Sequence, residues 1–250
     1  MIHYKMSRNL VDAHCHIHSC QKLSQEDIIA EAEKVGVKYM LNIFEIHKET
    51  INYMTHSSIF YGAAVHPQNV DEIVWQEAEK VLRQEMPNLH VIGETGLDLF
   101  RNKNLDKQIE YLENHVNLAL EFNKPIVIHA RDCHIRDITT RMKTPWQLHC
   151  FTFGMAEAKE VLNHGGYISF SGIVTFNRQE ILREVVRYCP LESILIETDC
   201  PFLTPAPYRG QENYPKYVSL IYDLIAQIKG IEPAVLEQTV EANFRKFINI

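Results

Sequence analysis

The chain has 250 residues, of which 46% are hydrophobic and 23% are charged, and its formal net charge is −7. This composition is ordinary for a soluble globular protein, and the length suits a single α/β barrel domain over residues 1–250. The negative charge argues against a broad cationic surface for nucleic acid, but it leaves a phosphate substrate open, because bound divalent ions carry their own positive charge.

Short apolar runs alternate with longer amphipathic segments along the chain. Eight apolar runs predict β-strands: Leu10–His14, Lys38–Ile43, Phe60–Val65, Val91–Gly93, Pro125–Ile128, Trp146–Leu148, Tyr167–Phe170 and Ser193–Ile196. Six amphipathic segments predict helices: Ser24–Val35, Asp71–Met86, Asp106–Phe122, Met155–Asn163, Gln179–Tyr188 and Tyr217–Lys229. The first helix opens with a capping-box pattern, in which Asp27 follows Ser24 by three residues. Such strand–helix units predict a (β/α)8 TIM-type barrel, and the alternative of an open doubly wound sheet lacks a glycine-rich phosphate loop after the first strand.

The first strand runs into Asp12-Ala13-His14-Cys15-His16. Alternation along a strand places Asp12, His14 and His16 on one face and Cys15 on the other. Two imidazoles two residues apart can hold one metal ion, and a nearby carboxylate can orient them. Taken alone, the pattern fits equally well two hydrogen-bonded histidines at a polar strand end.

Later strands repeat this pattern at the end where barrel enzymes carry their chemistry. His, Asp or Glu stands at six of the eight predicted strand ends: Asp12, His14 and His16; His66; Glu94 and Asp98; His129 and Asp132; His149; Glu197 and Asp199. The other two strands offer only Asn42 and Ser169. Histidines with carboxylates suit zinc or manganese better than calcium, and more ligands than one tetrahedral site needs indicate two ions with a bridging carboxylate. Asp199 is a candidate to hold the attacking water and take its proton.

The cysteines and the N-terminus predict the compartment. The six cysteines form no Cys-x-x-Cys pair, and a chain of this length needs no disulfide framework. The segment Met1–Asn9 lacks the apolar stretch of a secretory signal. No apolar run approaches the roughly 20 residues that span a bilayer. We therefore expect a cytoplasmic protein with reduced thiols and no membrane association, in which Cys15 packs rather than ligates.

Six segments in order resemble the TatD family of metal-dependent hydrolases, within the amidohydrolase-like barrels. They are Val11–His16, Val65–Pro67, Ile92–Asp98, Lys124–Asp132, His149–Gly154 and Ile196–Pro205, and the closing Asn243–Phe247 also fits.

The resemblance implies two divalent ions, either zinc, magnesium or manganese. His14 and His16 would bind one ion and His129 and His149 the other, with Glu94 as a bridge and Asp199 as a ligand that assists the water. Glu94 and Asp199 would thus be the catalytic residues. Four further groups would support the ligands or face the substrate: His66, Asp98, Arg131 and Glu197. The structural alternatives are that Glu197 only supports Asp199 and that Arg131 pairs with Asp132.

The resemblance also implies deoxyribonuclease activity on DNA or an oligonucleotide, and no protein partner is inferred. The chain departs from the family pattern at several points. His18 or Ser19 fills the usual acidic position after the His-x-His pair, and Cys200 replaces a small residue. In the segment Arg209–Pro215, Tyr214 replaces the expected glutamate, unless Glu212 takes over that role. The region between the last two histidines of the motif set leaves little room for a helix.

Two other functions remain open from the sequence. One is hydrolysis of a small ester, amide or lactone, because the ligand set does not separate phosphodiester from carbonyl chemistry. The other is a non-catalytic metal-stabilised protein that binds a partner. The presence of Asp199 argues against the second, since a scaffold needs no water-activating carboxylate.

Overall fold

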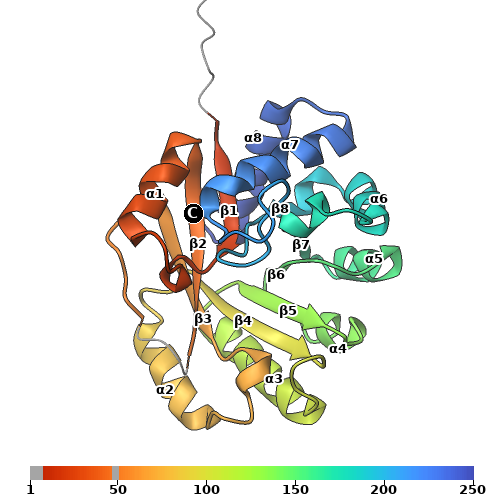
Figure 1. Cartoon of the computed structure of the whole chain (residues 1–250). Helices are drawn as coiled ribbons and strands as arrows, with labels where there is room; N and C mark the ends of the chain where they lie inside the picture. The colour runs from red at the N-terminus through yellow and green to blue at the C-terminus, as the bar shows by residue number, and fades with distance from the viewer. Residues whose placement is uncertain (1–7, 47–50) are drawn as a thin grey trace, which may run out of the picture.

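The computed structural model describes residues 8–46 and 51–250, so most of the segment assessed for a secretory signal lies outside it. Within the described residues, eight parallel strands form one sheet in the order β1 to β8, and the helices lie outside the ring of strands (Figure 1). The strands are β1 Leu10–Cys15, β2 Val37–Glu45, β3 Ile59–Ala64, β4 Val91–Asp98, β5 Ile126–Arg131, β6 Trp146–Leu148, β7 Tyr167–Phe170 and β8 Ile194–Ile196. The helices are α1 Gln25–Lys34, α2 Trp75–Glu85, α3 Leu105–Glu121, α4 Arg136–Thr139, α5 Met155–Asn163, α6 Glu180–Tyr188, α7 Val218–Lys229 and α8 Pro233–Phe247. The prediction of a (β/α)8 barrel is confirmed.

The ring closes between β1 and the residues that follow β8. The amide of Asp199 donates to the carbonyl of His14 at 3.0 Å, and the amide of His16 donates to the carbonyl of Cys200 at 2.7 Å. These bonds tie the first strand directly to the last loop. They also bring the His-x-His pair beside Asp199, although the two segments lie at opposite ends of the sequence.

The barrel is built from strands that are buried on both faces and helices that bury one face. All six residues of β1 are buried, as expected for a parallel strand inside a barrel. Helix α1 buries Ile28, Ile29 and Ala32, and the Ser24 hydroxyl accepts a hydrogen bond from the Asp27 amide at 3.1 Å, which confirms the predicted helix start. None of the helices in the described ranges has the length and apolar character needed to cross a bilayer.

Strand β4 is longer than predicted, because the sequence signal stops at Gly93 whereas the strand continues to Asp98. Its second half holds glycine and buried polar residues, which weaken the apolar pattern of a strand. Gly96 has φ +143°, and a Cβ atom there would lie 2.0 Å from the carbonyl oxygen of His129. A glycine at this position therefore lets β4 and β5 approach closely, and Glu94 lies within β4 rather than after it.

Two helix predictions need correction. Helix α2 begins at Trp75 rather than Asp71, because the Asp71 carboxylate accepts hydrogen bonds from the side chains of Asn102 and Asn104 in the loop between β4 and α3. Helix α8 was not predicted. Pro233 stands in its first turn, a position where proline is tolerated, and its apolar face is buried. The short helix α4 agrees with the small space predicted between β5 and β6.

Candidate metal centre

Nine of the ten predicted site residues meet at the carboxyl ends of the strands. They are His14 and His16 from β1, His66 after β3, Glu94 and Asp98 from β4, His129 from β5, His149 after β6, and Glu197 and Asp199 after β8. Arg131 is the tenth, and its exposed guanidinium lies over the ring of Phe100 instead, with Cζ 3.9 Å from the ring centre. Arg131 therefore contacts Phe100 and does not pair with Asp132 as the sequence suggested.

The Oε1 atom of Glu94 faces three histidine nitrogens. It lies 2.6 Å from Nδ1 of His129, 2.6 Å from Nε2 of His149 and 3.3 Å from Nε2 of His66. Nδ1 of His129 and Nε2 of His149 are themselves 3.2 Å apart. One carboxylate oxygen therefore lies close to the histidines at the ends of β3, β5 and β6.

The Oε2 atom of Glu94 faces the His-x-His pair. It lies 3.5 Å from Nε2 of His14 and 3.9 Å from Nε2 of His16. The Oδ1 atom of Asp199 lies 3.7 Å and 3.5 Å from the same two nitrogens. Two carboxylates and two imidazoles thus surround a second common volume, on the other side of Glu94.

These donor sets fit divalent cations. Nε2 of His14 and Nε2 of His16 lie 3.1 Å apart, and at most one of two neutral rings can donate a proton across that contact. Ligand atoms about 2.0–2.2 Å from a tetrahedral ion lie roughly 3.3–3.6 Å from one another, close to the spacings found here. Three overlapping groups have ligand atoms within 4.8 Å of one another: His14, His149 and Asp199; His14, His16 and Glu94; and His66, Glu94 and His129.

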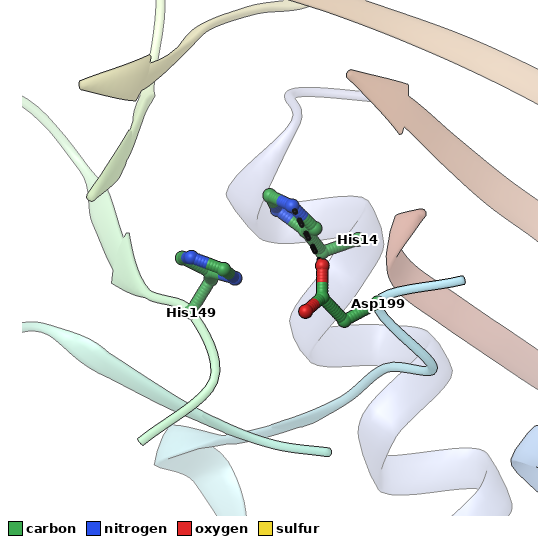
Figure 2. A group of neighbouring side chains, drawn as sticks. All are labelled: His14, His149 and Asp199. Atoms are coloured by element: carbon green, nitrogen blue, oxygen red, sulfur yellow. Dashed lines mark ion pairs between the residues drawn. The ribbon is translucent and has the colours of Figure 1, made fainter. Parts of the chain in front are cut away.

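The first of these groups shows how the two halves meet. Figure 2 shows the rings of His14 and His149 lying against each other and the Asp199 carboxylate directed at His14. The two ring centres are 4.0 Å apart with an angle of 17° between the planes. Side chains from β1, from the residue after β6 and from the loop after β8 therefore line one compact centre.

Supporting groups fix the orientation of three histidines. Nε2 of His129 lies 3.1 Å from Oδ2 of Asp98, and Nδ1 of His149 lies 3.3 Å from Oε1 of Glu197. Nδ1 of His16 lies 2.7 Å from the carbonyl oxygen of Ile43. In each ring the second nitrogen is left facing the cluster, which is the usual arrangement for metal-binding histidines.

Several supporting residues were not predicted as site residues. The Glu197 carboxylate accepts hydrogen bonds from the Cys150 amide at 2.7 Å and from the Ser169 hydroxyl at 2.5 Å, and Nε2 of Gln147 lies 3.3 Å from it. Glu197 therefore supports His149 rather than Asp199. Only Ser169 stood out in the sequence, as a polar strand end, because Gln147 lies inside a predicted strand.

Asp12 has a different role from the one its position suggested. Its carboxylate accepts hydrogen bonds from the amide and hydroxyl of Thr198, so it anchors the residue before Asp199 rather than orienting the histidines. Burial raises the pKa of Asp12 to about 8, although these hydrogen bonds oppose the rise. Cys15 is buried with its thiol on the Leu41 carbonyl at 3.3 Å, facing away from the cluster as strand alternation predicted.

The segment that departs from the family pattern joins the two ligand-bearing loops. The Glu212 carboxylate accepts hydrogen bonds from the amides of Gln21 and Lys22, at 2.8 and 3.1 Å, and from the Tyr214 hydroxyl. The Asn213 side chain donates to the Thr198 carbonyl at 2.8 Å. Tyr214 and Glu212 thus act together to hold the loop after β8 against the loop after β1.

The centre is strongly coupled electrostatically. Burial would raise the pKa of Glu94, but the charges of His149 and His66 and hydrogen bonds from His129 and His14 hold it well below its usual range. Burial likewise opposes protonation of His149, but Glu94 and Glu197 raise the pKa of this imidazole well above its usual value. The pKa of His16 is raised to about 9, mainly by Asp199, against the effect of burial. The buried carboxylates therefore attract positive charge to this volume.

Comparison with known proteins identifies the family. The family model described as TatD related DNase matches residues 11–249. The chain belongs to the TatD family. It is 33% identical over 256 residues to the metal-dependent hydrolase YcfH of Escherichia coli K12, and the match covers 96% of each chain. It is 32% identical over 254 residues to the metal-dependent hydrolase YabD of Bacillus subtilis, covering 96% of this chain and 99% of YabD.

Solved structures agree with this fold. The TatD homologue YJJV of Escherichia coli K12 superposes with a TM-score of 0.87 at 20% identity, and the match covers 98% of this chain and 100% of YJJV. An uncharacterized amidohydrolase of Saccharomyces cerevisiae superposes with a TM-score of 0.78 at 14% identity, covering 96% and 99% of the two chains. Family membership makes the chain a TatD-type metal-dependent hydrolase, and the clustered histidines and carboxylates could bind the metal.

Proposed function

We propose that this TatD-family hydrolase is a deoxyribonuclease that holds two divalent ions, of zinc, magnesium or manganese, and cleaves phosphodiester bonds with water. His14, His16 and Asp199 would hold one ion, His129 and His149 the other, and Glu94 would bridge them. Such ions supply Lewis-acid charge to the phosphate and acidify the attacking water. The description of the matching family model as a DNase supports this substrate class.

The observation that carries the proposal is that the two carboxylate oxygens of Glu94 face different sets of histidines. Its Oε1 atom faces His129 and His149, and its Oε2 atom faces His14 and His16. A carboxylate that serves two sets of nitrogens in this way suits a pair of ions, and paired ions about 3.5–4 Å apart suit in-line displacement at phosphorus. His66 also faces Oε1, so it is a further candidate ligand or a group that meets the phosphate.

Asp199 is the residue best placed to handle the proton of the attacking water. It follows β8 in a left-handed backbone conformation, φ +57°, that turns its carboxylate toward the two histidines of β1. Burial raises its pKa, but His16, His149 and His14 outweigh that effect and lower it, so the carboxylate is ionised at neutral pH. An ionised carboxylate can orient the water and accept its proton, an effect typically worth about 10²–10⁴ in rate.

The test is a parallel assay on two substrate classes. Metal-reconstituted protein is incubated with single-stranded DNA and, separately, with a panel of carboxylic esters, amides and lactones. We expect release of nucleotides from DNA and no comparable turnover of the carbonyl compounds. Turnover of a carbonyl substrate without DNA cleavage would favour the small-molecule hydrolase instead, and inactivity on both with metals bound would favour a binding protein.

The matched variant in this assay is Asp199→Asn, which keeps the shape and one oxygen of the side chain. We expect DNA turnover to fall at least about a hundredfold. Metal content, measured by elemental analysis on the same sample, separates loss of the proton acceptor from loss of an ion. A variant that keeps both ions and cleaves DNA within a few fold of the parent would remove Asp199 from the mechanism.

The proposal treats residues 1–250 as one catalytic domain that works in the cytoplasm. Six free cysteines are consistent with a reducing compartment. Fractionation of cells that express the protein at its natural level tests the location.

A further inference from the structure

Two exposed phenylalanines stand on the loops next to the metal centre. Phe100 is 52% exposed and Phe202 is 57% exposed. Phe100 follows Asp98 by two residues, and Phe202 follows Asp199 by three. Each aromatic ring therefore comes directly after a carboxylate of the cluster, one after β4 and the other after β8.

The Phe100 ring is held in place on the His129 side of the centre. Its amide donates to Oδ1 of Asp98 at 3.0 Å, while Oδ2 of the same carboxylate lies 3.1 Å from Nε2 of His129. The guanidinium carbon of Arg131 lies 3.9 Å from the ring centre. The pair thus joins a flat apolar surface to a positive charge at the mouth of the barrel.

The Phe202 ring is held on the other side, beside the His-x-His pair. Its amide donates to the Asp199 carbonyl at 2.9 Å, and its own carbonyl accepts a hydrogen bond from the Asn213 side chain at 2.5 Å. The ring centre lies 6.2 Å from that of His16, with the planes at 66°. Phe100 and Phe202 therefore flank opposite halves of the cluster on ordered backbone.

A purely structural explanation exists for each ring. Single apolar side chains are common on protein surfaces, and an exposed cation–π pair such as Phe100 with Arg131 stabilises a fold only slightly. Two features favour a binding role. The rings stand on both sides of one catalytic centre, and further arginines occupy the loops at this end of the barrel, among them Arg101 and Arg209. Arg209 also lies over an aromatic ring, with Cζ 4.0 Å from the ring centre of Phe176.

We propose that Phe100, together with Arg131, and Phe202 bind the two unpaired bases on either side of the cleaved phosphodiester. This inference rests on the proposed deoxyribonuclease function. Every base has an aromatic face, so stacking on such rings tolerates any sequence, whereas the guanidinium attracts the phosphate next to the stacked base. Bases paired within a duplex are stacked on one another and are not free to meet the two rings.

Binding measurements test the two rings directly. The variants are Phe100→Ala, Phe202→Ala and Arg131→Gln, each made in the Asp199→Asn protein so that the DNA survives the titration. The control is Tyr188→Ala, which removes a ring that is 48% exposed and lies 5.4 Å from Nζ of Lys159. Tyr188 ends α6, which leads into β8, so this similar pair lies at the opposite end of the barrel.

The readout is the anisotropy of a labelled single-stranded oligonucleotide. We expect each phenylalanine variant to bind about tenfold to a hundredfold more weakly, and the tyrosine control to bind as the parent does. Arg131→Gln should weaken binding and reduce the dependence of log affinity on log salt by about one phosphate contact. The parent should also quench a 2-aminopurine base placed beside the cleavage site, and the phenylalanine variants should not.

Oligonucleotides with single abasic positions separate this inference from the proposed function. The parent should bind such DNA more weakly than intact DNA, and the corresponding phenylalanine variant should no longer distinguish the two. If the active protein cleaves DNA but the phenylalanine variants bind and discriminate as the parent does, the stacking proposal is wrong while the nuclease assignment stands. If the parent neither binds nor cleaves single-stranded DNA, both are wrong.

Discussion

Glu94→Gln is the substitution that most directly tests a shared carboxylate. Both oxygens of Glu94 face histidine nitrogens, at 2.6 Å for His149 on one side and 3.5 Å for His14 on the other. The glutamine side chain keeps the shape of the glutamate but removes one negative charge and one of the two ligand oxygens. We therefore expect both metal affinities to fall, not one.

The size of the effect follows from the charge that is removed. Two unit charges about 4 Å apart interact by about 4 kcal/mol at an effective dielectric constant of about 20, and the double charge of each ion doubles this value. The remaining carbonyl oxygen of the glutamine recovers part of this. Loss of a carboxylate that only supports a ligand already costs about 10–100-fold in affinity. We expect at least a hundredfold loss at each site, equivalent to about 2.8 kcal/mol.

The assay is calorimetric titration of metal-free protein with zinc or manganese, with Asp98→Asn as the matched control. Asp98 is also a carboxylate of the cluster, but the histidine that it contacts is His129, on one side of Glu94 only. The same chemical change there should weaken a single binding step. Two steps of parental affinity in Glu94→Gln, or a loss confined to one step, would refute the bridging role.

Two further predictions concern the histidines. The double substitution of His14 and His16 by alanine should lose at least one ion while the far-ultraviolet circular dichroism stays that of the parent, and unchanged metal content in folded protein would contradict the assignment. His115 is buried with its Nε2 accepting from the Val65 amide at 3.2 Å, and burial lowers its pKa to about 4. Because the unfolded imidazole takes up a proton near pH 6.5 and the folded one does not, His115 by itself should contribute a loss of about 3 kcal/mol in the free energy of unfolding between pH 6.5 and 4. Denaturant titrations should show that His115→Gln reduces this loss, whereas the exposed His164→Gln leaves it unchanged.

The barrel and the clustering of its ligands could be predicted because both depend on local patterns. Strands buried on both faces give continuous apolar runs, and a functional strand end interrupts such a run with a polar residue. Trp146–Leu148 and Tyr167–Phe170 were therefore predicted with the bounds that the structure has. Strand β4 was predicted too short because Gly93, Glu94 and Gly96 serve the site and not the strand. A segment that is shaped by its function loses the pattern of its secondary structure.

The supporting contacts could not be predicted, because they depend on the register between distant strands. The sequence places Glu197 two residues from Asp199, which suggested that it supports that neighbour. In the barrel, however, β8 pairs with β7 and β7 pairs with β6, so Glu197 at the end of β8 reaches Ser169 and His149 instead. In the same way, the contact between Arg131 and Phe100 joins the end of β5 to the loop after β4. Adjacency in the chain suggests Asp132 as the partner of Arg131, and only the fold shows that the partner is Phe100.

The charge balance of the centre links metal binding to pH. Buried carboxylates require nearby positive charge, and in the metal-free protein protonated histidines provide it. The pKa of His16 is raised to about 9 by Asp199 and Glu94 despite burial, and the pKa values of His129 and His149 are also raised. At pH 7 the His16 imidazole therefore carries a proton, and the raised pKa values of the other two favour their protonated forms, whereas a histidine that binds a metal ion must be neutral.

Each ion must consequently displace protons as it binds. Raising the pH removes those protons beforehand, so the apparent metal affinity should increase from pH 6 through neutral and level off once the pH exceeds the pKa of His16, about 9. At pH 7, titrations in two buffers with different heats of ionisation should reveal release of at least one proton for each ion. His16→Gln should release fewer protons than the parent, because it removes one of the groups that is protonated before binding. If the binding heats do not depend on the buffer, the histidines are already neutral, and the carboxylates of this centre are balanced in some other way.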